Sequence, residues 1–364
     1  MDDKPGRPST QEEVKGHRAG AAEEPEYVAA TPRRGGVMNT LYPPKPGGGG
    51  RFKNHCRKFW WCDLLVIAVI VLVITLPVVY VAIPNKAQHD LNKSTLEVTS
   101  QDVSNPAPNS VHLKLVSVAK SSSSFHPTIE GFNASLSLKD LPPFVYLNIP
   151  ETKAEASTDI TVDQDVPIAD MEQFINYNKV VMGSESFDIY FDGKTKIHQS
   201  GLHAIDVNYN KVVTMKGLNK LQGLNITGIK ILDKNLADGS NMIGNVSVPN
   251  PSVMTLSLGN VTMNLAVDGK SIGYSLIPDM VLKPGDNILP MQSTVNQGTV
   301  ITLITSKYNN AILPLSIVGN SSVKDGQHLE YYEAAIKSNT INLDLNVGPA
   351  LAELGLNLTS LGGA

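Results

Sequence analysis

One run of 20 residues without a charged side chain, residues 64–83, constrains this chain more than any other feature. As a helix it would cross the ~30 Å hydrocarbon core of a bilayer. Trp60, Trp61 and Tyr80 lie near its edges, where amphipathic rings favour the interface. A buried core helix and a cleaved signal peptide are the alternatives. The run starts late, however, and no small-residue cleavage site follows it. We therefore predict a transmembrane helix over residues 60–83.

Charge on either side of this run indicates its orientation. Lys86 and Lys93, which follow it, are offset by Asp90 and Glu97. The basic residues that precede it have no acid between them: Arg51, Lys53, Arg57 and Lys58. An excess of Lys and Arg marks the cytosolic side. The sequence thus predicts a single-pass type II protein, with its N-terminus in the cytosol and its C-terminus in a lumen or outside the cell.

Acceptor sequences for N-glycosylation agree with this orientation. They occur only after the apolar run, at Asn92, Asn133, Asn225, Asn245, Asn260, Asn320 and Asn357. Asn and Ser are common there, so several would arise by chance. We interpret the set as support for an exported glycoprotein.

Charge and cysteine content exclude some functions. Residues 1–63 carry 11 Lys and Arg against 8 Asp and Glu, whereas the remainder carries 19 against 26. An acidic body is a poor partner for nucleic acid, because phosphate binding depends on Lys and Arg. Cys56 and Cys62 are the two cysteines, so the sequence after them has neither a disulfide nor a thiolate metal site.

The first 59 residues are rich in Pro, Gly and charge, which predicts a disordered cytosolic tail. Residues 42–46, Tyr-Pro-Pro-Lys-Pro, are either a polyproline ligand or a linker. Cys56 and Cys62 lie at the membrane boundary and are candidates for palmitoylation, with unmodified cysteines as the alternative.

Alternation of apolar and polar residues dominates the segment after the apolar run. It is clear over residues 132–138, 187–191, 261–267 and 341–347. Strands of this kind bury one face and suit antiparallel sheets. Helices are expected at residues 171–181, after a capping-box sequence at Asp170, and at residues 329–337. The expected fold is mostly β: one transmembrane helix, then a tandem pair of antiparallel β-sandwich domains with a few short helices.

An internal repeat supports the tandem pair. His-Pro-Thr-Ile at 126–129, Ile-Pro at 149–150 and the segment 187–193 recur 124, 128 and 126 residues later. A duplicated domain gives such offsets; shared turn chemistry is the alternative. The expected divisions are a linker (84–110), a first sandwich (111–216), a joint near 217–223, a second sandwich (224–350) and a C-terminal tail (351–364).

Residues 248–287 resemble the late embryogenesis abundant type 2 domain, also called the water-stress and hypersensitive-response domain. The matching places are Asn250-Pro251, Asp268-Gly269, Ile272-Gly273 and Pro284-Gly285. Residues 90–350 are also similar to a fungal membrane-anchored family of uncharacterised function, through blocks at 126–136, 216–219 and 282–285. These resemblances imply a seven-stranded sandwich with a helix, a vacuolar or other endomembrane location or the plasma membrane, and lipid carried between sheets.

A lipid groove would need an apolar slot in a splayed sandwich. The residues expected to line it are Val261, Met263, Leu265, Ile277, Leu303 and Leu315. In a closed sandwich the same side chains would simply be core. A buried chain would gain ~0.8 kcal/mol per CH₂.

Catalytic and metal-binding patterns are weak. His198 and His203 are five residues apart, but no His-Glu-x-x-His sequence is present. Ser184 and Ser186 approach a nucleophile elbow without its closing glycine. Asp159, Asp163 and Asp165 are typical of a solvated strand or loop, and no phosphate-binding loop occurs. We expect a non-enzymatic protein without cofactor or metal, which binds membrane lipid. The alternative is a glycosylated structural module that binds lumenal or cell-surface proteins.

Overall fold

The computed structural model describes residues 50–356, and the side chains of residues 60–356. The expected disordered tail and its Tyr-Pro-Pro-Lys-Pro sequence lie outside residues 50–356, as does Asn357, and the side chain of Cys56 is also outside the described part. The chain divides into two compact units after Val73. The second unit, Ile74–Ala364, contains the end of the apolar run and all the strands of the body.

The apolar run is helical throughout. It forms α2 (Gly50–Pro77), a π-helical turn (Val78–Ala82) and α3 (Ile83–Lys93). Pro77 has no N–H to donate, and the wider turn directly after it accommodates the missing hydrogen bond. Within the described residues, Trp60–Lys93 is the one helix long and apolar enough to cross a membrane. This confirms the expectation of one such helix.

The expected linker at residues 84–110 is wrong. Those residues continue as α3 and then form β1, so the first half of the body begins near residue 95 and not at 111. The helix continues because Pro84 occupies its first turn, where proline is tolerated. The strand forms because Val98 and Val103 pack into the main core.

Two sheets make up the body. The larger contains β10 (Asn225–Ile231), β11 (Met242–Asn250), β14 (Gly285–Val295), β13 (Lys270–Leu282), β12 (Met254–Val267), β1 (Thr95–Ala107), β2 (Ser110–Lys120) and β7 (Ser157–Pro167) in that order, with β15 (Ile312–Lys324), β16 (Gln327–His328) and β17 (Thr340–Asn346) joined through β12. The smaller contains β5 (Val145–Ile149), β4 (Phe132–Ser137), β8 (Ser186–His198), β3 (Thr128–Ile129) and β6 (Thr152–Lys153), with β9 (Ile205–Lys216) beside β8.

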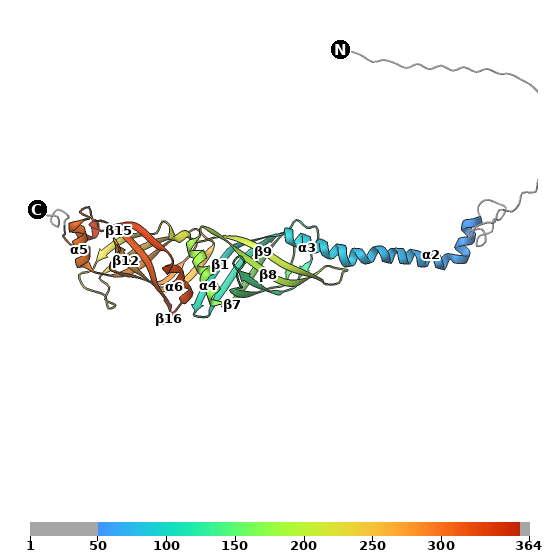
Figure 1. The fold of residues 1–364 in the computed structure, drawn as a ribbon, viewed down its shortest axis with the longest axis horizontal. Helices are drawn as coiled ribbons and strands as arrows, with labels where there is room; N and C mark the ends of the chain where they lie inside the picture. The colour runs from blue at the N-terminus through green and yellow to red at the C-terminus, as the bar shows by residue number, and fades with distance from the viewer. Residues whose placement is uncertain (1–49, 357–364) are drawn as a thin grey trace, which may run out of the picture. The chain divides into compact units, whose positions relative to one another are not determined.

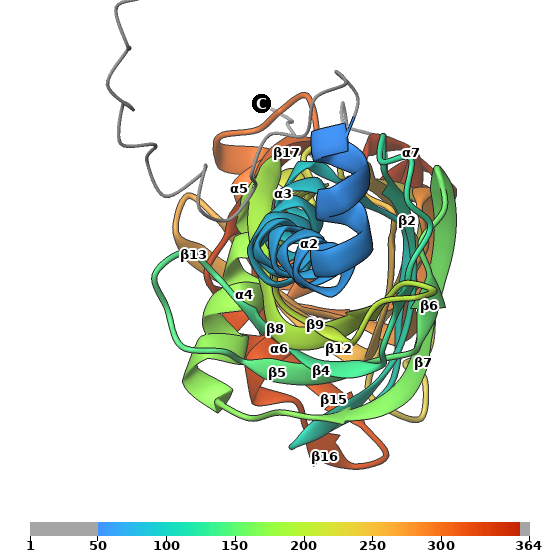
Figure 2. The ribbon, with the colours of Figure 1, turned by 90° about the vertical axis from the view of Figure 1, so that its right-hand side faces the viewer.

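The sheets form sandwich-like layers around a buried interior. In Figure 2, β2 and β7 lie at the right, while β4, β5, β8 and β9 run below. Helices close the layers: α4 (Met171–Gly183), α5 (Gln297–Ser306), α6 (Glu330–Lys337) and α7 (Gly348–Glu353). The mostly β fold expected from the alternating sequence is confirmed, as are helices at the two positions named for them.

The two halves repeat the same order of strand pairings. In the first half β1 pairs with β2, β2 with β7, β4 with β5 and β8, and β8 with β9. The second half has the corresponding pairings in the same order: β10 pairs with β11, β11 with β14, β12 with β13 and β15, and β15 with β17. The bridge of Val145 to Ile168 corresponds to the pair Gly273 and Val295. The two halves therefore share one order of strands, with a helix before the last two paired strands of each: α4 before β8 and β9, and α5 before β15 and β17.

A parallel pairing and two packed helices join the halves. β1 lies parallel to β12, with Gln101 opposite Met254. Figure 1 shows α6, from the second half, beside α4, from the first. The ring of Tyr331 on α6 meets that of Phe174 on α4 edge-on at 4.9 Å, and its hydroxyl donates to the Ala107 carbonyl at 3.1 Å. One continuous core runs through both halves.

The motif residues behind the family resemblance are structural. Asn250 is buried; its side chain accepts from the Ser252 amide and donates to the Met254 carbonyl at 2.7 Å. Asn287 closes the following turn through the Lys283 amide and carbonyl. Asp268 and Gly269 both have positive φ, as a two-residue hairpin turn requires. These motif residues stabilise turns and strand ends of the fold.

Candidate functional site

The continuation of the apolar helix docks on the first half of the body. Ile83, Ala87 and Leu91 follow one another at four-residue spacing, which places them on one face of α3. That face packs against a small apolar cluster at the ends of β8 and β9, built around Ile197 and Ile205. The cluster is separate from the main core, so the described chain has a second site of apolar packing, next to the end of the apolar run.

Polar bonds fix the helix to the edge strand β9. The Gln88 side chain donates to the Asn208 carbonyl and accepts from the Asn208 amide, both at 2.8 Å. Lys211 points its ammonium at the end of α3 and donates to the carbonyls of Leu91 and Ser94. The Leu91 carbonyl also accepts from the Ser94 amide at 3.2 Å, so the ammonium adds a charged donor at the C-terminal end of the helix, where a cation is favourable. Burial lowers the pKa of Lys211 to about 8.

A cavity of about 380 Å³ lies between this helix and the sheets; we call it the juxtamembrane cavity. One wall is the inner face of α3, from Ala82 to Ser94. The other walls are largely apolar side chains from β2, β3, β7, β8 and β9 and the loops between them: Ala119, Phe125, Pro127, Ile129, Ala154, Ile160, Ile197, Leu202, Ile205 and Tyr209. The volume falls within the ~300–1,000 Å³ of small-ligand sites. The cavity is therefore large enough for an apolar ligand.

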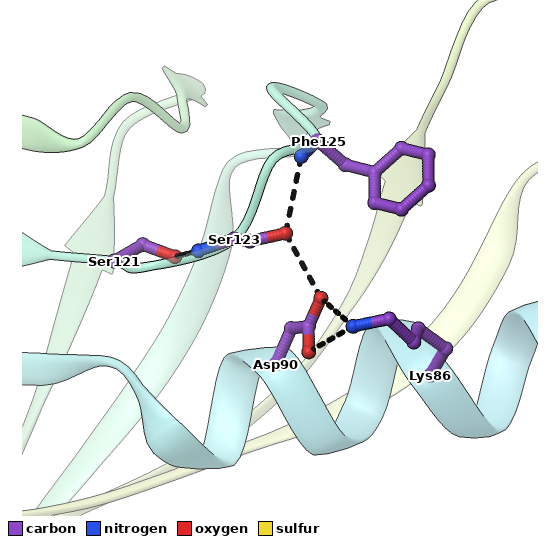
Figure 3. Close-up of polar contacts among 5 residues, drawn as sticks. All are labelled: Lys86, Asp90, Ser121, Ser123 and Phe125. Atoms are coloured by element: carbon purple, nitrogen blue, oxygen red, sulfur yellow. Dashed lines mark hydrogen bonds and ion pairs between the residues drawn. The ribbon is translucent and has the colours of Figure 1, made fainter.

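A polar network connects the loop between β2 and β3, residues 121–127, to α3 (Figure 3). Asp90 accepts from Lys86 at 2.7 and 2.8 Å and from the Ser123 hydroxyl at 2.9 Å. The hydrogen bond from Lys86 is the main reason that the pKa of Asp90 is lowered. Ser123 accepts in turn from the Phe125 amide at 3.2 Å, and the Phe125 ring remains 53% exposed. The loop is held by one carboxylate and presents an aromatic ring to solvent.

Charged side chains in the cavity wall all have a partner of opposite charge. Lys86 pairs with Asp90. Lys120 lies 3.2 Å from the carboxylate of Glu97 on the neighbouring strand. Glu155 lies 3.5 Å from Lys153, the last residue of β6. The wall therefore carries no net charge to select an ionic ligand.

Two neutral polar side chains in the wall stand apart from these pairs. The Oε1 atom of Gln199 is buried and accepts no hydrogen bond. Tyr209 is partly buried, with its ring 5.1 Å from that of Phe132, and burial raises its pKa to about 12. Both groups are neutral at physiological pH, so they suit a neutral ligand.

The β8–β9 loop brings the cavity close to the end of the apolar run. His203 in this loop lies with its ring 5.1 Å from that of Tyr80, one turn before α3. Figure 1 shows the same loop reaching along the helix. Tyr80 belongs to the apolar run, so one end of the cavity lies at the level where that run ends.

The groove residues predicted from sequence do not line this cavity. Leu265 and Leu315 line a smaller cavity, of about 120 Å³, which is enclosed by strands of the larger sheet together with α5 and α7. Val261, Met263 and Ile277 are buried in the main core. Leu303 lies on α5 and packs against that core. The spacing of Ile83, Ala87 and Leu91 was the available signal for the juxtamembrane cavity, but the composition of that segment indicated a linker.

The other candidate residues lie on the surface. The predicted sequon asparagines within the described residues, Asn92, Asn133, Asn225, Asn245, Asn260 and Asn320, are all exposed. Cys62 is free and exposed. His112 lies between Asp163 and Asp165, and its hydrogen bond to Asp165 raises its pKa. Asp159 faces Val118 on the neighbouring strand.

The remaining candidates do not converge on one site. His198 pairs with Glu130, whereas His203 lies against Tyr80. Ser184 ends α4, and Ser186 starts β8. Over residues 60–356, His, Cys, Asp and Glu form no group of three or more that could hold a metal ion.

Comparison with known proteins adds a family match. The model of a family described as a protein of unknown function (DUF3712) matches residues 142–265, from just before β5 into β12. The match thus covers parts of both halves and less than half of the chain. Among curated proteins there is no significant match.

Solved structures show only remote likeness. The periplasmic chaperone SfaE matches over 68% of this chain and 98% of its own, at 10% identity and a TM-score of 0.17. A bacterial adhesin from Mobiluncus mulieris, with intramolecular disulfide, isopeptide and ester cross-links, matches over 67% of this chain and 83% of its own, at 7% identity and a TM-score of 0.19. Likeness at this level carries no information about function.

Proposed function

We propose that this is a single-pass membrane protein whose β-rich body binds a membrane lipid in the juxtamembrane cavity. The observation that carries the proposal is the continuity of the cavity wall with the apolar helix. Ala82 and Ile83 belong both to the end of the apolar run and to the wall. A lipid entering the cavity would therefore leave the bilayer along a surface that stays apolar.

Leaving the bilayer costs a lipid free energy in proportion to the apolar surface it exposes. Each CH₂ moved from hydrocarbon into water costs ~0.8 kcal/mol, so a chain drawn out into solvent would return at once. A cavity lined by Ile129, Ile160, Ile197 and Ile205 replaces those lost apolar contacts. Holding a lipid outside the bilayer then needs little compensating energy.

Orientation belongs to the same proposal. The basic residues before the apolar run favour a cytosolic N-terminus, and the exposed sequon asparagines favour an exported body. The side chains of Asn92, Asn225 and Asn260 accept hydrogen bonds through their oxygens, and these bonds do not involve the nitrogen, the atom to which a glycan attaches. The resemblance to the fungal membrane-anchored family, and to the late embryogenesis abundant type 2 domain, favours an endomembrane such as the vacuole.

Native mass spectrometry of the full chain, purified in mild detergent, tests lipid binding. We expect lipid to co-purify with the natural protein and to be lost from Ala87→Trp, whose indole would occupy the cavity. His89→Trp is the matched control, because His89 lies on the same helix with its side chain exposed. Ala119→Trp fills the cavity from the opposite wall and guards against a helix effect. Equal lipid content in all four proteins would overturn the proposal.

A glycosylated interaction module is the second candidate. The exposure of all six described sequon asparagines favours it, since glycans there would cover much of both halves. The two functions separate in one comparison. The interaction module would be favoured if the natural protein carries no lipid and if Ala87→Trp still binds the same protein partner as the natural protein.

A further inference from the structure

Two loops of the first half lie beside the helix at the place where the apolar run ends. They are the β2–β3 loop, residues 121–127, and the β8–β9 loop, residues 199–204. The first supplies Phe125 to the wall of the juxtamembrane cavity, which also contains the last residues of the run. In the second, the ring of His203 lies 5.1 Å from that of Tyr80, which is within the run. The two loops therefore meet the helix at nearly the same level.

The depth of these loops relative to a bilayer follows from the helix. Lys86 comes three residues after Ile83, the end of the run, and so lies about 4–5 Å further along the axis. The head-group layer on each side of the hydrocarbon core is roughly 5–7 Å thick. In Figure 3 the Phe125 ring extends beside α3 from Asp90 toward Lys86. A run that fills the hydrocarbon core would therefore place this ring at the depth of the head groups.

The composition of both loops suits contact with a bilayer. The β2–β3 loop reads Ser-Ser-Ser-Ser-Phe-His-Pro and the β8–β9 loop reads Gln-Ser-Gly-Leu-His-Ala, so neither contains Asp, Glu, Lys or Arg. The loop between β10 and β11, residues 232–241, contains three such residues. A charged side chain in a bilayer costs far more free energy than a neutral one. The two uncharged loops can therefore enter the head-group layer at little cost.

Phe125 differs from the other phenylalanines of residues 84–356. It is exposed, whereas the others are buried or half-buried: Phe132, Phe144, Phe174, Phe187 and Phe191. The backbone on both sides of Phe125 is fixed. The Ser123 hydroxyl donates to Asp90 at 2.9 Å, and the Pro127 carbonyl accepts from the Ala154 amide at 2.8 Å. The ring is therefore presented outward by an anchored loop, as are the apolar side chains that bury in the head-group boundary of a bilayer.

Charge around the loops indicates which lipids this surface would contact. The charged side chains of the cavity wall pair with neighbours of opposite sign: Lys86 with Asp90, Lys120 with Glu97, and Glu155 with Lys153. Attraction to anionic lipids depends on clusters of Lys and Arg. The paired charges of this wall provide no such cluster, so the surface suits head groups without net charge.

We propose that the β2–β3 and β8–β9 loops form a membrane-contact surface of the body, on which the Phe125 ring enters the head-group layer of a bilayer of zwitterionic lipid. The inference rests on the proposed function and specifies where the body meets the membrane. It places the juxtamembrane cavity against the bilayer surface, so a lipid enters the cavity without crossing water.

Tryptophan fluorescence of the full chain in nanodiscs tests this surface. Trp60 and Trp61 are the two tryptophans of the chain, so replacing both by Phe gives a background in which Phe125→Trp is the one emitter. The discs contain phosphatidylcholine that is brominated near the head group, because bromine quenches an indole that it touches. We expect Phe125→Trp to be quenched about as strongly as Trp60 and Trp61 are in the natural protein. Ile288→Trp in the same background is the matched control, since Ile288 is 72% exposed on β14 of the second half and should not be quenched.

Two variations of the experiment separate the bilayer from other sources of quenching. Adding Ala119→Phe fills the cavity from its wall, so quenching of Phe125→Trp that persists comes from the bilayer and not from a lipid inside the cavity. Replacing part of the phosphatidylcholine by phosphatidylserine should leave the quenching unchanged, because the surface does not depend on anionic head groups.

The outcomes distinguish the contact surface from the proposed function. The contact surface is wrong if Phe125→Trp is not quenched, or loses its quenching when Ala119→Phe is added, while Trp60 and Trp61 of the natural protein are quenched. Quenching that requires phosphatidylserine would overturn the assignment to zwitterionic lipid. If Trp60 and Trp61 of the natural protein are not quenched either, the helix does not lie in the bilayer and the proposed function itself fails.

Discussion

Replacing Lys211 by Met should release α3 from the body without unfolding the sheets. The substitution removes the donor to the carbonyls of Leu91 and Ser94. The Leu91 carbonyl still accepts from the Ser94 hydroxyl at 2.7 Å in this variant. The main loss is therefore the hydrogen bond from Lys211 to the Ser94 carbonyl. The effect should therefore be local to the end of the helix and the start of β1.

The size of the effect follows from two opposing contributions. Two hydrogen bonds from a charged donor stabilise by ~1.5–3 kcal/mol each. Burial lowers the pKa of Lys211 from 10.5 to about 8, which corresponds to a desolvation cost of roughly 3 kcal/mol. The midpoint of the difference is about 1.5 kcal/mol in favour of the natural protein, or roughly a tenfold change in the helix-docking equilibrium.

Hydrogen exchange measured by mass spectrometry reports this change directly. The Asn208 amide donates to the Gln88 side chain, so it loses protection when α3 leaves β9. We expect faster exchange at Asn208 and over residues 83–94, with unchanged exchange in β12 and β13. Lys216→Met, on the same strand but exposed, is the control. Unchanged exchange at both places in Lys211→Met would refute the role given to this cap.

Three further predictions concern the body. Asn250→Ala should lower stability by about 2–3 kcal/mol, because it removes buried hydrogen bonds to Ser252 and Met254; urea unfolding would show it, and an unchanged midpoint would contradict it. Gly319→Val should cost at least about 2 kcal/mol, since even a Cβ there would lie 2.4 Å from the side chain of Ile336; a melting temperature equal to that of the natural protein would count against the packing of α6. As the pH rises from about 8 to about 10.5, the natural protein should become more stable relative to Lys211→Met. Burial lowers the pKa of this lysine to about 8, so in this range the unfolded chain binds a proton that the folded chain does not. A difference in melting temperature between the two proteins that stays constant over this range would contradict the prediction.

Local sequence patterns predicted the elements of this fold well. The Asp170 side chain caps α4 through the Gln173 amide at 3.0 Å, as the capping sequence indicates. The reciprocal half of that box is absent, because Gln173 accepts from Asn176 instead. Alternating segments became β4, β8, β12 and β17. These outcomes depend on neighbours in the chain, which is why sequence alone could foresee them.

Features that depend on distant contacts were missed. The parallel pairing of β1 with β12 joins residues about 150 positions apart, and no local period indicates it. The apolar stripe of Ile83, Ala87 and Leu91 is interrupted by Pro84 and Lys86, so it resembled a polar linker once the uncharged run ended. The predicted groove fell in the second half because alternation cannot distinguish a side chain in a filled core from one beside a cavity. Only the packing of both sheets decides that.

Photo-crosslinking in membranes tests lipid binding in the juxtamembrane cavity most directly. A diazirine-bearing sterol would be incorporated into membranes that contain the full chain, irradiated, and mapped by peptide mass spectrometry. We predict adducts on the cavity wall, in residues 82–94, 119–129 and 197–209, and their loss in Ala87→Trp. Adducts confined to residues 60–81, with the same pattern in both proteins, would show that lipid touches only the outside of the helix and would contradict the proposed function.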